Sequence, residues 1–368
     1  MIEFIDIITD LKNGDCGKRE ISYQLNKREE YTHSMRVNGG PNSGGNVHYL
    51  DKDGIEKHIV LHQVPTGILH GKKCIIGSGC VINVDKLYKE VQEIKAAGFD
   101  VEDKIFVAKN AHLILERHVN MEKTESSIGT TRQGIGPCYS DKYYRIGVRA
   151  ENILKECDDC DDEKYQIINK WLDSILIDLY EEFYNPKNKI SILVEMAQGF
   201  ELDIDHGDYP YVTSSHTTVS GALLNLLPYN KVRKVYGVCK AYDTYVGNKK
   251  FQPDEQIFKD LCELGNEKGA TTGRLRQCNW LDLHALEKAI KVNCVTHLII
   301  SKLDVLEKLN EENANKFWIF KTKPTTTIFK EFKQTKENFV KSAEQFIKDF
   351  EPNIQIQWRS APSHPVEI

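Results

Sequence analysis

The stretch FIDIITDLKNGDCGKRE, residues 4–20, joins a short isoleucine-rich run to a loop that contains two glycines. An apolar run of this length, bounded by turn residues, is typical of a buried strand. In the loop that follows, Gly14 and Gly17 relax the backbone, and Lys18 is placed to reach a phosphate. The loop resembles a phosphate-binding P-loop without matching the GxxxxGK[ST] pattern. The stretch therefore predicts a strand followed by an anion-binding loop.

The order of strand and helix continues along the chain of 368 residues. Further strands are predicted at residues 58–64, 74–84, 104–108, 189–197, 232–242, 297–304 and 354–358, and amphipathic helices at residues 87–99, 163–184, 254–264, 283–292 and 336–350. This alternation predicts an α/β fold with a mainly parallel central sheet flanked by helices. We expect a single domain over residues 1–368 with a helical insertion around residues 150–188. Ligands of such sheets collect in the loops that leave the carboxyl ends of the strands.

The composition narrows the class of protein. A formal net charge of −5 and a pI near 6.2 give no positive field that would attract nucleic acid. No run of 18 apolar residues and no targeting signal is visible, so we expect a cytoplasmic protein without a membrane span. The ten cysteines are expected to stay reduced. Cys157 and Cys160 are expected to lie in an acidic loop, because a zinc site needs a second ligand pair.

Five more loops are rich in residues that bind anions or tolerate unusual backbone conformations. RVNGGPNSGGNVHY (36–49) contains four glycines and three asparagines, which lets its backbone approach a ligand closely. Residues 126–149 and 266–282 combine paired threonines with glycines and arginines, which suits phosphate or carboxylate groups. Residues 195–218 are polar throughout, and SKLD (301–304) ends a predicted strand. Taken alone, each could also be an ordinary surface loop.

In their order along the chain, these loops resemble the adenylosuccinate synthetases, which join IMP and aspartate using GTP. The resemblance runs from NGDCGK to WRSAP and includes LHQVPTGILHGKKCIIGSGCVIN, IGTTRQGIGPCYSDK, LDIDHGDYPYVTSSHTT, NEKGATTGR, WLD and SKLD. In length the chain is similar to the compact archaeal and phage type of the family. The resemblance implies a P-loop-like nucleotide-binding fold and a homodimeric ligase that uses Mg²⁺ and GTP.

The resemblance also implies roles for individual residues. GTP would phosphorylate O6 of IMP, and aspartate would displace that phosphate at C6. Asp15 would take the N1 proton and bind Mg²⁺ together with the carbonyl of Gly44, and Lys18 would steady the phosphoryl group. The residues implied for the acceptor nucleotide are Asn42, Thr130, Thr131, Gln198, Thr213, Arg274 and, reaching over from a second subunit, Arg145. Those implied for aspartate are Thr271, Thr272 and Arg276. Those implied for GTP are Gly14, Gly17, Gly44, Gly45, Asn46, Lys302, Asp304, Arg359, Ser360 and Ala361, with Lys302 and Asp304 reading guanine.

The chain departs from the family's pattern at the phosphoryl group. The family's general-acid histidine falls on Gly45, while Cys16 and Met196 replace a glutamate and a glycine. Arg19 stands where the family has a glycine. We expect Arg19 to supply the missing stabilisation, since phosphoryl transfer depends on charge neutralisation more than on protonation. His48, three residues after Gly45, is the alternative.

These departures leave other functions open. The carboxylate of Asp15 favours IMP as acceptor, and SKLD favours GTP as donor. The alternative is a phage-type synthetase that joins (d)GMP and aspartate to 2-aminoadenylosuccinate with ATP, dATP or GTP as donor, which Gly45 and the compact length favour. A non-catalytic nucleotide-binding relative is a third hypothesis, based mainly on the absent histidine. A signalling GTPase is not indicated, because no Walker-type GK[ST] is present.

Overall fold

The computed structural model describes residues 1–123, 128–156, 163–269, 273–314, 316–322, 329–331, 335–360 and 365–368. The loop predicted around Cys157 and Cys160 lies outside these residues. Eight cysteines lie within them, and all eight are free thiols. No helix in this part of the chain is long and apolar enough to cross a membrane.

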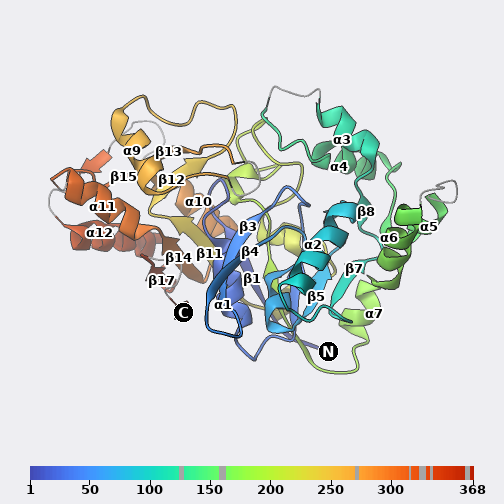
Figure 1. The fold of residues 1–368 in the computed structure, drawn as a ribbon. Coiled ribbons are helices and arrows are strands. Elements are labelled where there is room, and N and C mark those ends of the chain that lie inside the picture. Colours follow the sequence, from blue (N-terminus) through green and yellow to red (C-terminus); the bar gives the residue numbers. More distant parts are fainter. Residues whose placement is uncertain are drawn as a thin grey trace.

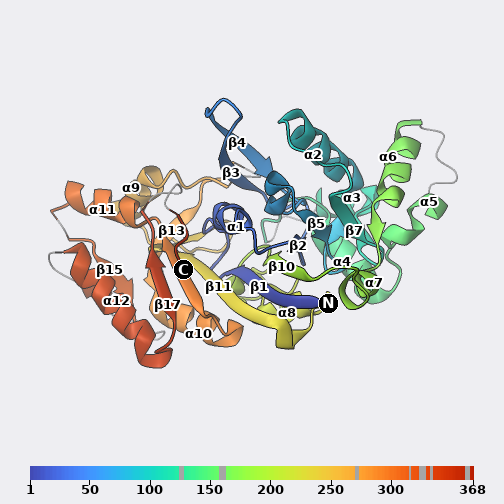
Figure 2. The same cartoon turned by 90° about the horizontal axis from the view of Figure 1, so that it is seen from below.

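A nine-stranded sheet forms the centre of the molecule (Figures 1 and 2). Its order is β17-β14-β11-β1-β10-β2-β5-β7-β9, and all neighbouring strands pair in parallel. The strands are β1 (Ile2–Asp10), β2 (His33–Arg36), β5 (Lys73–Ile76), β7 (Ile105–Ala108), β9 (Leu176–Ile177), β10 (Ile190–Glu195), β11 (Val232–Lys240), β14 (His297–Ser301) and β17 (Gln355–Trp358). β1, with the sequence IEFIDIITD, is buried from Ile5 to Asp10, as expected for a strand covered on both faces.

Helices cover the sheet. They are α1 (Lys18–Asn26), α2 (Val84–Ala96), α3 (Glu116–Lys123), α4 (Ile135–Tyr144), α5 (Ile153–Glu156), α6 (Glu163–Ser174), α7 (Leu179–Tyr184), α8 (Val219–Leu223), α9 (Gln256–Leu264), α10 (Leu283–Asn293), α11 (Leu303–Glu312) and α12 (Lys336–Phe350). Short 3-10 turns are η1 (Thr66–His70), η2 (Ala150–Asn152), η3 (Phe200–Leu202) and η4 (Tyr229–Lys231). Both views place α9, α11 and α12 at the β17 side of the sheet and α2, α5 and α6 at the β7 side (Figures 1 and 2).

Smaller sheets flank the central one. A four-stranded sheet contains β12 (Tyr242–Tyr245), β13 (Gln277–Asp282), β15 (Ile319–Lys321) and β16 (Phe329–Glu331). An antiparallel hairpin joins β3 (Gly45–Leu50) and β4 (Glu56–Leu61), and a two-stranded parallel pair joins β6 (Val81–Ile82) and β8 (His112–Leu113). Two large apolar clusters, one around β5 and α2 and the other around α10 and α12, fill the two halves of the molecule.

The predicted α/β class, the mainly parallel sheet and most predicted elements are confirmed. Four element predictions are wrong in detail. The predicted strand at 297–304 ends at Ser301, and Leu303 and Asp304 begin α11. Residues 58–64 were expected as a buried strand, but β4 lies in a largely exposed hairpin, where apolar residues cover only one side. The predicted strand at 74–84 breaks into β5 and β6 at Gly77–Cys80. The predicted helix at 163–184 is split by β9, which pairs with β7 as an edge strand, and Asp178 then caps α7.

Candidate active site

One buried carboxylate organises the loop between β1 and α1. Asp10, the last residue of β1, accepts hydrogen bonds from the backbone N–H groups of Lys12 (3.0 Å), Gly14 (3.3 Å) and Cys16 (3.0 Å). Its Oδ2 lies 3.3 Å from Nζ of Lys18. Sequence reasoning missed Asp10, because it is the polar end of an apolar run and belongs to no motif. The loop shape is therefore fixed by the protein itself.

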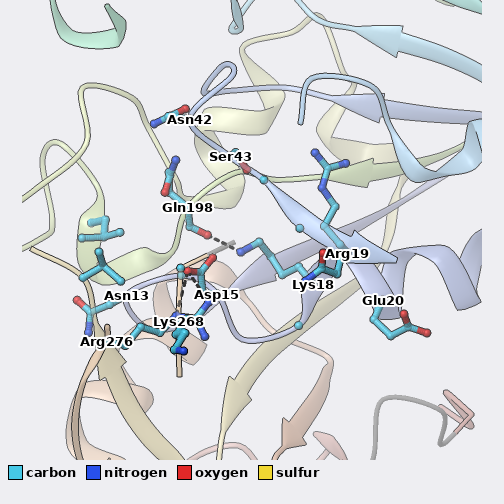
Figure 3. A pocket seen from close by; sticks show the side chains of 18 of the residues that line it. Asn13, Asp15, Lys18, Arg19, Glu20, Asn42, Ser43, Gln198, Lys268 and Arg276 are labelled. Carbon is cyan, nitrogen blue, oxygen red and sulfur yellow. Dashed lines mark hydrogen bonds and ion pairs between the residues drawn. The ribbon is translucent and has the colours of Figure 1, made fainter. Parts of the chain in front are cut away.

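The same loop turns tightly before α1 begins. Gly14, Asp15 and Gly17 have φ values of 85°, 58° and 91°, in the left-handed region. Nζ of Lys18 donates to the carbonyl of Gln198 at 2.7 Å, which ties the loop to the one that follows β10 (Figure 3). The predicted residues Asp15, Lys18 and Gln198 thus lie together at the carboxyl ends of β1 and β10.

Asp15 faces an arginine from the loop before β13. Its Oδ2 lies 2.9 Å from Nη2 and 3.2 Å from Nε of Arg276 (Figure 3). Arg276 also pairs with the buried Glu267, which forms a second ion pair with Lys240 at 2.7 Å and accepts from the hydroxyl of Tyr242 at 2.6 Å. Burial disfavours the charge of Glu267, but Lys240 and Arg276 outweigh it and hold its pKa at about 2. Arg276 is therefore fixed between two carboxylates.

Arg19 is oriented differently from what we expected. Its Nη1 lies 3.0 Å from Oε2 of the buried Glu195 and donates to the carbonyl of Val64 at 3.0 Å, while Nη2 donates to the carbonyl of His62. Figure 3 shows its guanidinium pointing away from Lys18. This arrangement does not support the direct contact with a phosphoryl group that the sequence suggested, because the guanidinium already has protein partners.

The glycine-rich loop at residues 36–49 explains part of the orientation of the Arg19 side chain. A Cβ on Gly45 would contact Cγ of Arg19 and lie 3.0 Å from its Cβ, so the arginine fills the space of the absent side chain. Asn42 accepts from the backbone N–H of Gly40 at 3.2 Å and holds the loop in shape. The ring of His48, the alternative to Arg19, projects from β3 towards Glu56 at 3.5 Å and is half exposed.

Three cavities bring most of the predicted residues together. The largest, of about 580 Å³, is lined by Gly14, Asp15, Gly17, Lys18, Arg19, Asn42, Gly44, Gly45, Asn46, Thr131, Gln198, Arg274, Arg276 and Lys302. A second, of about 380 Å³, is lined by Asn42, Thr130, Thr131, Gln198 and Thr213. A third, of about 210 Å³, is lined by Asp15, Gly17, Asn46, Arg276, Lys302, Asp304, Arg359 and Ser360. Shared lining residues connect the first cavity to both others.

The 210 Å³ cavity contains an unused acceptor. Oδ1 of Asp304 is buried and has no hydrogen-bond partner within the described residues. Nζ of Lys302 donates to the carbonyl of Gly265 at 3.0 Å, which extends the lysine stem along the cavity wall. An unpartnered carboxylate oxygen in such a cavity fits a ligand with N–H donors, which guanine has at N1 and its 2-amino group.

The remaining predicted residues either line none of the three cavities, are engaged by backbone carbonyls, or fall outside the described residues. Arg145 ends α4 at the surface with a φ of 70° and lines none of the three cavities. Arg274 donates to the carbonyls of Gly129 (2.9 Å) and Thr130 (3.3 Å). Thr271, Thr272 and Ala361 lie outside the described residues.

One cluster of metal-type ligands exists away from the predicted metal residues. Asp203, Asp205 and His216 offer ligand atoms within 4.8 Å of one another. The carboxylate of Asp203 already accepts from the backbone N–H groups of residues 205, 206 and 217, so this cluster is a turn-stabilising group. By contrast, the side chain of Asp15 is 40% exposed and lines the large cavity beside Gly44. Carboxylate and carbonyl oxygens of this kind suit Mg²⁺.

Comparisons with known proteins identify the family of this chain. The family model described as adenylosuccinate synthetase matches residues 7–187 and 159–348. The adenylosuccinate synthetase of Chlorobium limicola is 37% identical over 346 residues, which cover 83% of this chain and 77% of that protein. That of Thermodesulfovibrio yellowstonii is 36% identical over 342 residues, 83% of this chain and 78% of that protein.

Two solved structures are similar. The fully ligated adenylosuccinate synthetase from Plasmodium falciparum has a TM-score of 0.78 and 27% identity, with 98% of each chain covered. The succinoaminodeoxyadenylate synthetase of cyanophage S-2L, bound to dGMP and dATP as an energy donor, has a TM-score of 0.67 and covers 94% of this chain and all of that one. At 21% identity, the phage protein shares the fold alone. The chain therefore belongs to the adenylosuccinate synthetase family, and it is a ligase that joins IMP and L-aspartate using GTP.

Proposed function

We propose that the 580 Å³ cavity holds the GTP phosphates and the reacting edge of IMP, with the remainder of IMP in the 380 Å³ cavity and guanine in the 210 Å³ cavity. The observation that carries this proposal is the sharing of wall residues. Asn42 and Gln198 line both the first and second cavities, and Asp15 and Lys302 line both the first and third. A donor and an acceptor bound in this way would meet beside Asp15 and Lys18.

Asp15 and Lys18 are the catalytic residues of this proposal. Asp15 takes the N1 proton of IMP, which raises the nucleophilicity of O6, and Lys18 neutralises charge on the phosphoryl group during transfer. Phosphorylation converts O6 into a good leaving group, which aspartate then displaces. For Arg19 the contacts support a positioning role, because its guanidinium holds Glu195 and its stem fills the space at Gly45.

The remaining residues bind substrates. The acceptor nucleotide is held by Asn42, Thr130, Thr131, Gln198, Thr213, Arg274 and the partner's Arg145. Aspartate is held by Arg276 with Thr271 and Thr272. The GTP phosphates lie along Gly14, Gly17, Gly44, Gly45 and Asn46, and its guanine lies against Lys302, Asp304, Arg359, Ser360 and Ala361. The unpartnered Oδ1 of Asp304 supports guanine over adenine as the donor base.

Mg²⁺ would be held by the carboxylate of Asp15 and the carbonyl of Gly44. When bound, it supplies positive charge to the GTP phosphates and so lowers the barrier to phosphoryl transfer. The partial exposure of the Asp15 side chain at the cavity wall supports this position.

The active enzyme is proposed to be a homodimer. Arg145 lines neither of these cavities of its own chain yet carries a charge suited to a nucleotide phosphate. Tyr143, Tyr144 and Ile146 around it are 64%, 74% and 57% exposed, and such an apolar surface fits an interface. In the test, an Arg145→Leu variant is mixed with an Asp15→Asn variant. Mixed dimers should regain activity above either parent, and no recovery would refute the shared site.

Residues 1–368 are proposed to fold as one domain in which α5, α6 and α7 are the helical insertion. A role in purine nucleotide biosynthesis fits a cytoplasmic location.

The proposed site is tested by turnover. Asp15→Asn should abolish the coupled loss of IMP and GTP while leaving the folded structure intact. Asp53→Asn, in the exposed turn of the β3–β4 hairpin, is the matched control and should be silent. Each variant is assayed with IMP and dGMP, and with GTP and ATP. Full activity of Asp15→Asn, or a preference for dGMP, would contradict the proposal.

A further inference from the structure

Arg36 is a buried arginine at the wall of the 580 Å³ cavity. It is the last residue of β2, and only 3% of it is exposed. No hydrogen bond or ion pair joins its guanidinium to any residue that the structure describes. Arg36 nevertheless lines the 580 Å³ cavity that also contacts Lys18 and Gly45.

The nearest carboxylate in the sheet is already satisfied. Arg36 lies opposite Glu195 in the parallel pairing of β2 with β10, so both side chains leave the same face. Oε2 of Glu195 is taken by Arg19 at 3.0 Å. Oε1 accepts from the hydroxyl of Ser34 at 3.1 Å and from the backbone N–H of Thr66 at 2.7 Å as well as its hydroxyl. A carboxylate offers about four acceptor positions, and these four donors occupy them.

The carboxylates near Arg36 are therefore engaged by other donors. The buried Glu90 is bound by the backbone N–H groups of residues 62–64. Burial, and next the charge of Arg19, lower the pKa of Arg36 to about 10, so its guanidinium stays protonated at neutral pH. A buried guanidinium without a hydrogen-bond partner is unfavourable. An anion bound in the cavity would supply the partner that Arg36 lacks.

We propose that Arg36 is a further catalytic residue, whose guanidinium contacts an oxygen of the phosphoryl group as it passes from GTP to the acceptor. This inference rests on the proposed function of the cavity. β2 leads directly into the loop that carries Gly44 and Gly45, so Arg36 lies beneath the backbone assigned to the phosphates. Gly45 offers no side chain and Arg19 is engaged by Glu195, so Arg36 is the guanidinium at this end of the cavity that is not already held by a carboxylate.

The other substrate anions fit Arg36 less well. It does not line the 380 Å³ cavity, where Thr130 and Thr131 are assigned to the phosphate of IMP. The aspartate carboxylates are assigned to the loop before β13, whose Arg276 faces Asp15 on the other side of the first cavity. A phosphoryl group between Lys18 and Gly45 is the anion that the position of Arg36 favours.

The test compares Arg36→Met and Arg36→Lys with the parent enzyme, using Arg149→Met as a control at an exposed arginine that lines none of the three cavities. Removing a charge donor at the transition state typically lowers kcat by about 10²–10³-fold. We expect this loss in Arg36→Met, partial recovery in Arg36→Lys, and less than about threefold change in the affinities for GDP and IMP measured separately. The melting temperature should stay the same or rise, because an unpaired buried charge has been removed.

Several results would overturn the inference. An unchanged kcat in Arg36→Met would do so, as would a lower melting temperature with equal losses for every ligand, which indicates a structural role. A selective loss of IMP affinity, or a selective rise of the KM for aspartate, would assign Arg36 to that substrate instead. The variant Lys18→Met separates a failure of the role proposed for Arg36 from a failure of the proposed active site. If Lys18→Met is inactive and Arg36→Met is silent, only this inference fails, and if both are silent, the proposed site fails as well.

Discussion

The two sides of the large cavity differ in how completely the protein builds them. On the β1 side, backbone N–H groups converge on the carboxylate of Asp10, and Lys18 is held between Asp10 and a backbone carbonyl. On the other side, Arg276 is engaged by Asp15 and Arg274 by two backbone carbonyls. On the first side, Asp10 fixes the loop and the ammonium of Lys18 keeps one of its three N–H donors for a ligand. On the second side, Arg276 must exchange its contact with Asp15 for a substrate carboxylate.

The largest loss of stability and activity is expected when Asp10, which shapes the β1 side of the cavity, is replaced. Asp10→Ala removes the acceptor for three backbone N–H groups and the counter-charge of Lys18. Loss of a buried charge partner costs about 3–5 kcal/mol of the free energy of unfolding. Misplacing the loop should lower kcat/KM by about 10²-fold or more.

Chemical denaturation and steady-state kinetics measure both effects. Asp10→Asn is the intermediate variant, since its amide oxygen can still accept from Lys12 and Gly14 while the pair with Lys18 is lost, and it should retain part of the stability. If Asp10→Ala keeps parental stability and activity, the claim that Asp10 shapes the loop is wrong.

The next largest loss of activity is expected at Arg276, on the opposite side of the cavity. Arg276→Leu removes the guanidinium proposed to receive aspartate, and loss of a charged hydrogen-bond partner costs about 1.5–3 kcal/mol. We expect the KM for aspartate to rise about 100-fold, with little change in the KM for IMP. Lys288→Leu, at the exposed face of α10, serves as the control. An equal rise for both substrates would show that Arg276 acts mainly by holding Asp15.

A somewhat smaller effect is expected at the donor base. Asp304→Asn replaces one of the two carboxylate acceptors by an N–H donor, which guanine N–H groups cannot pair with. The ratio of kcat/KM for GTP to that for ATP should fall by about 10–50-fold. Competition between the two nucleotides gives this ratio directly. A ratio near one in the parent enzyme would already exclude Asp304 as the guanine reader.

The smallest effect on turnover is expected at Gly45. Gly45→His returns the family's residue, but its side chain would overlap the stem of Arg19. Overpacking of this kind costs about 1–3 kcal/mol, and we expect no gain in activity. The double variant Arg19→Gly/Gly45→His removes the overlap but leaves the buried Glu195 without its charge partner, so it should be less stable than the single variant. A more active single variant would mean that Arg19 moves aside readily.

The sequence predicted the elements with clear residue patterns, but not the contacts between residues far apart in the chain. The apolar runs of β1, β10 and β11 and the glycines of the first loop were readable, because burial and positive φ leave clear residue patterns. The strand β2 was missed, since HSMR has no apolar periodicity and is buried by its neighbours alone. The order of the motifs identified residues that line the cavities, but it did not show which side chains these residues bond to. Arg19 illustrates the limit, because Glu195 is 176 residues away and only the fold brings them together.

The ion pair of Asp15 and Arg276 couples the binding of Mg²⁺ with GTP to the binding of aspartate, although these ligands need not contact each other. While Oδ2 of Asp15 accepts from Nη2 and Nε of Arg276, that oxygen is not free for Mg²⁺ and that edge of the guanidinium is not free for aspartate. A ligand that takes Asp15 releases Arg276, and one that takes Arg276 releases Asp15. Thermodynamic linkage makes this assistance equal in both directions. Aspartate should bind more tightly in the presence of Mg²⁺ and GTP than alone, and calorimetric titrations with and without the nucleotide measure the difference. The resting enzyme thus favours an empty or a fully loaded site over a half-loaded one.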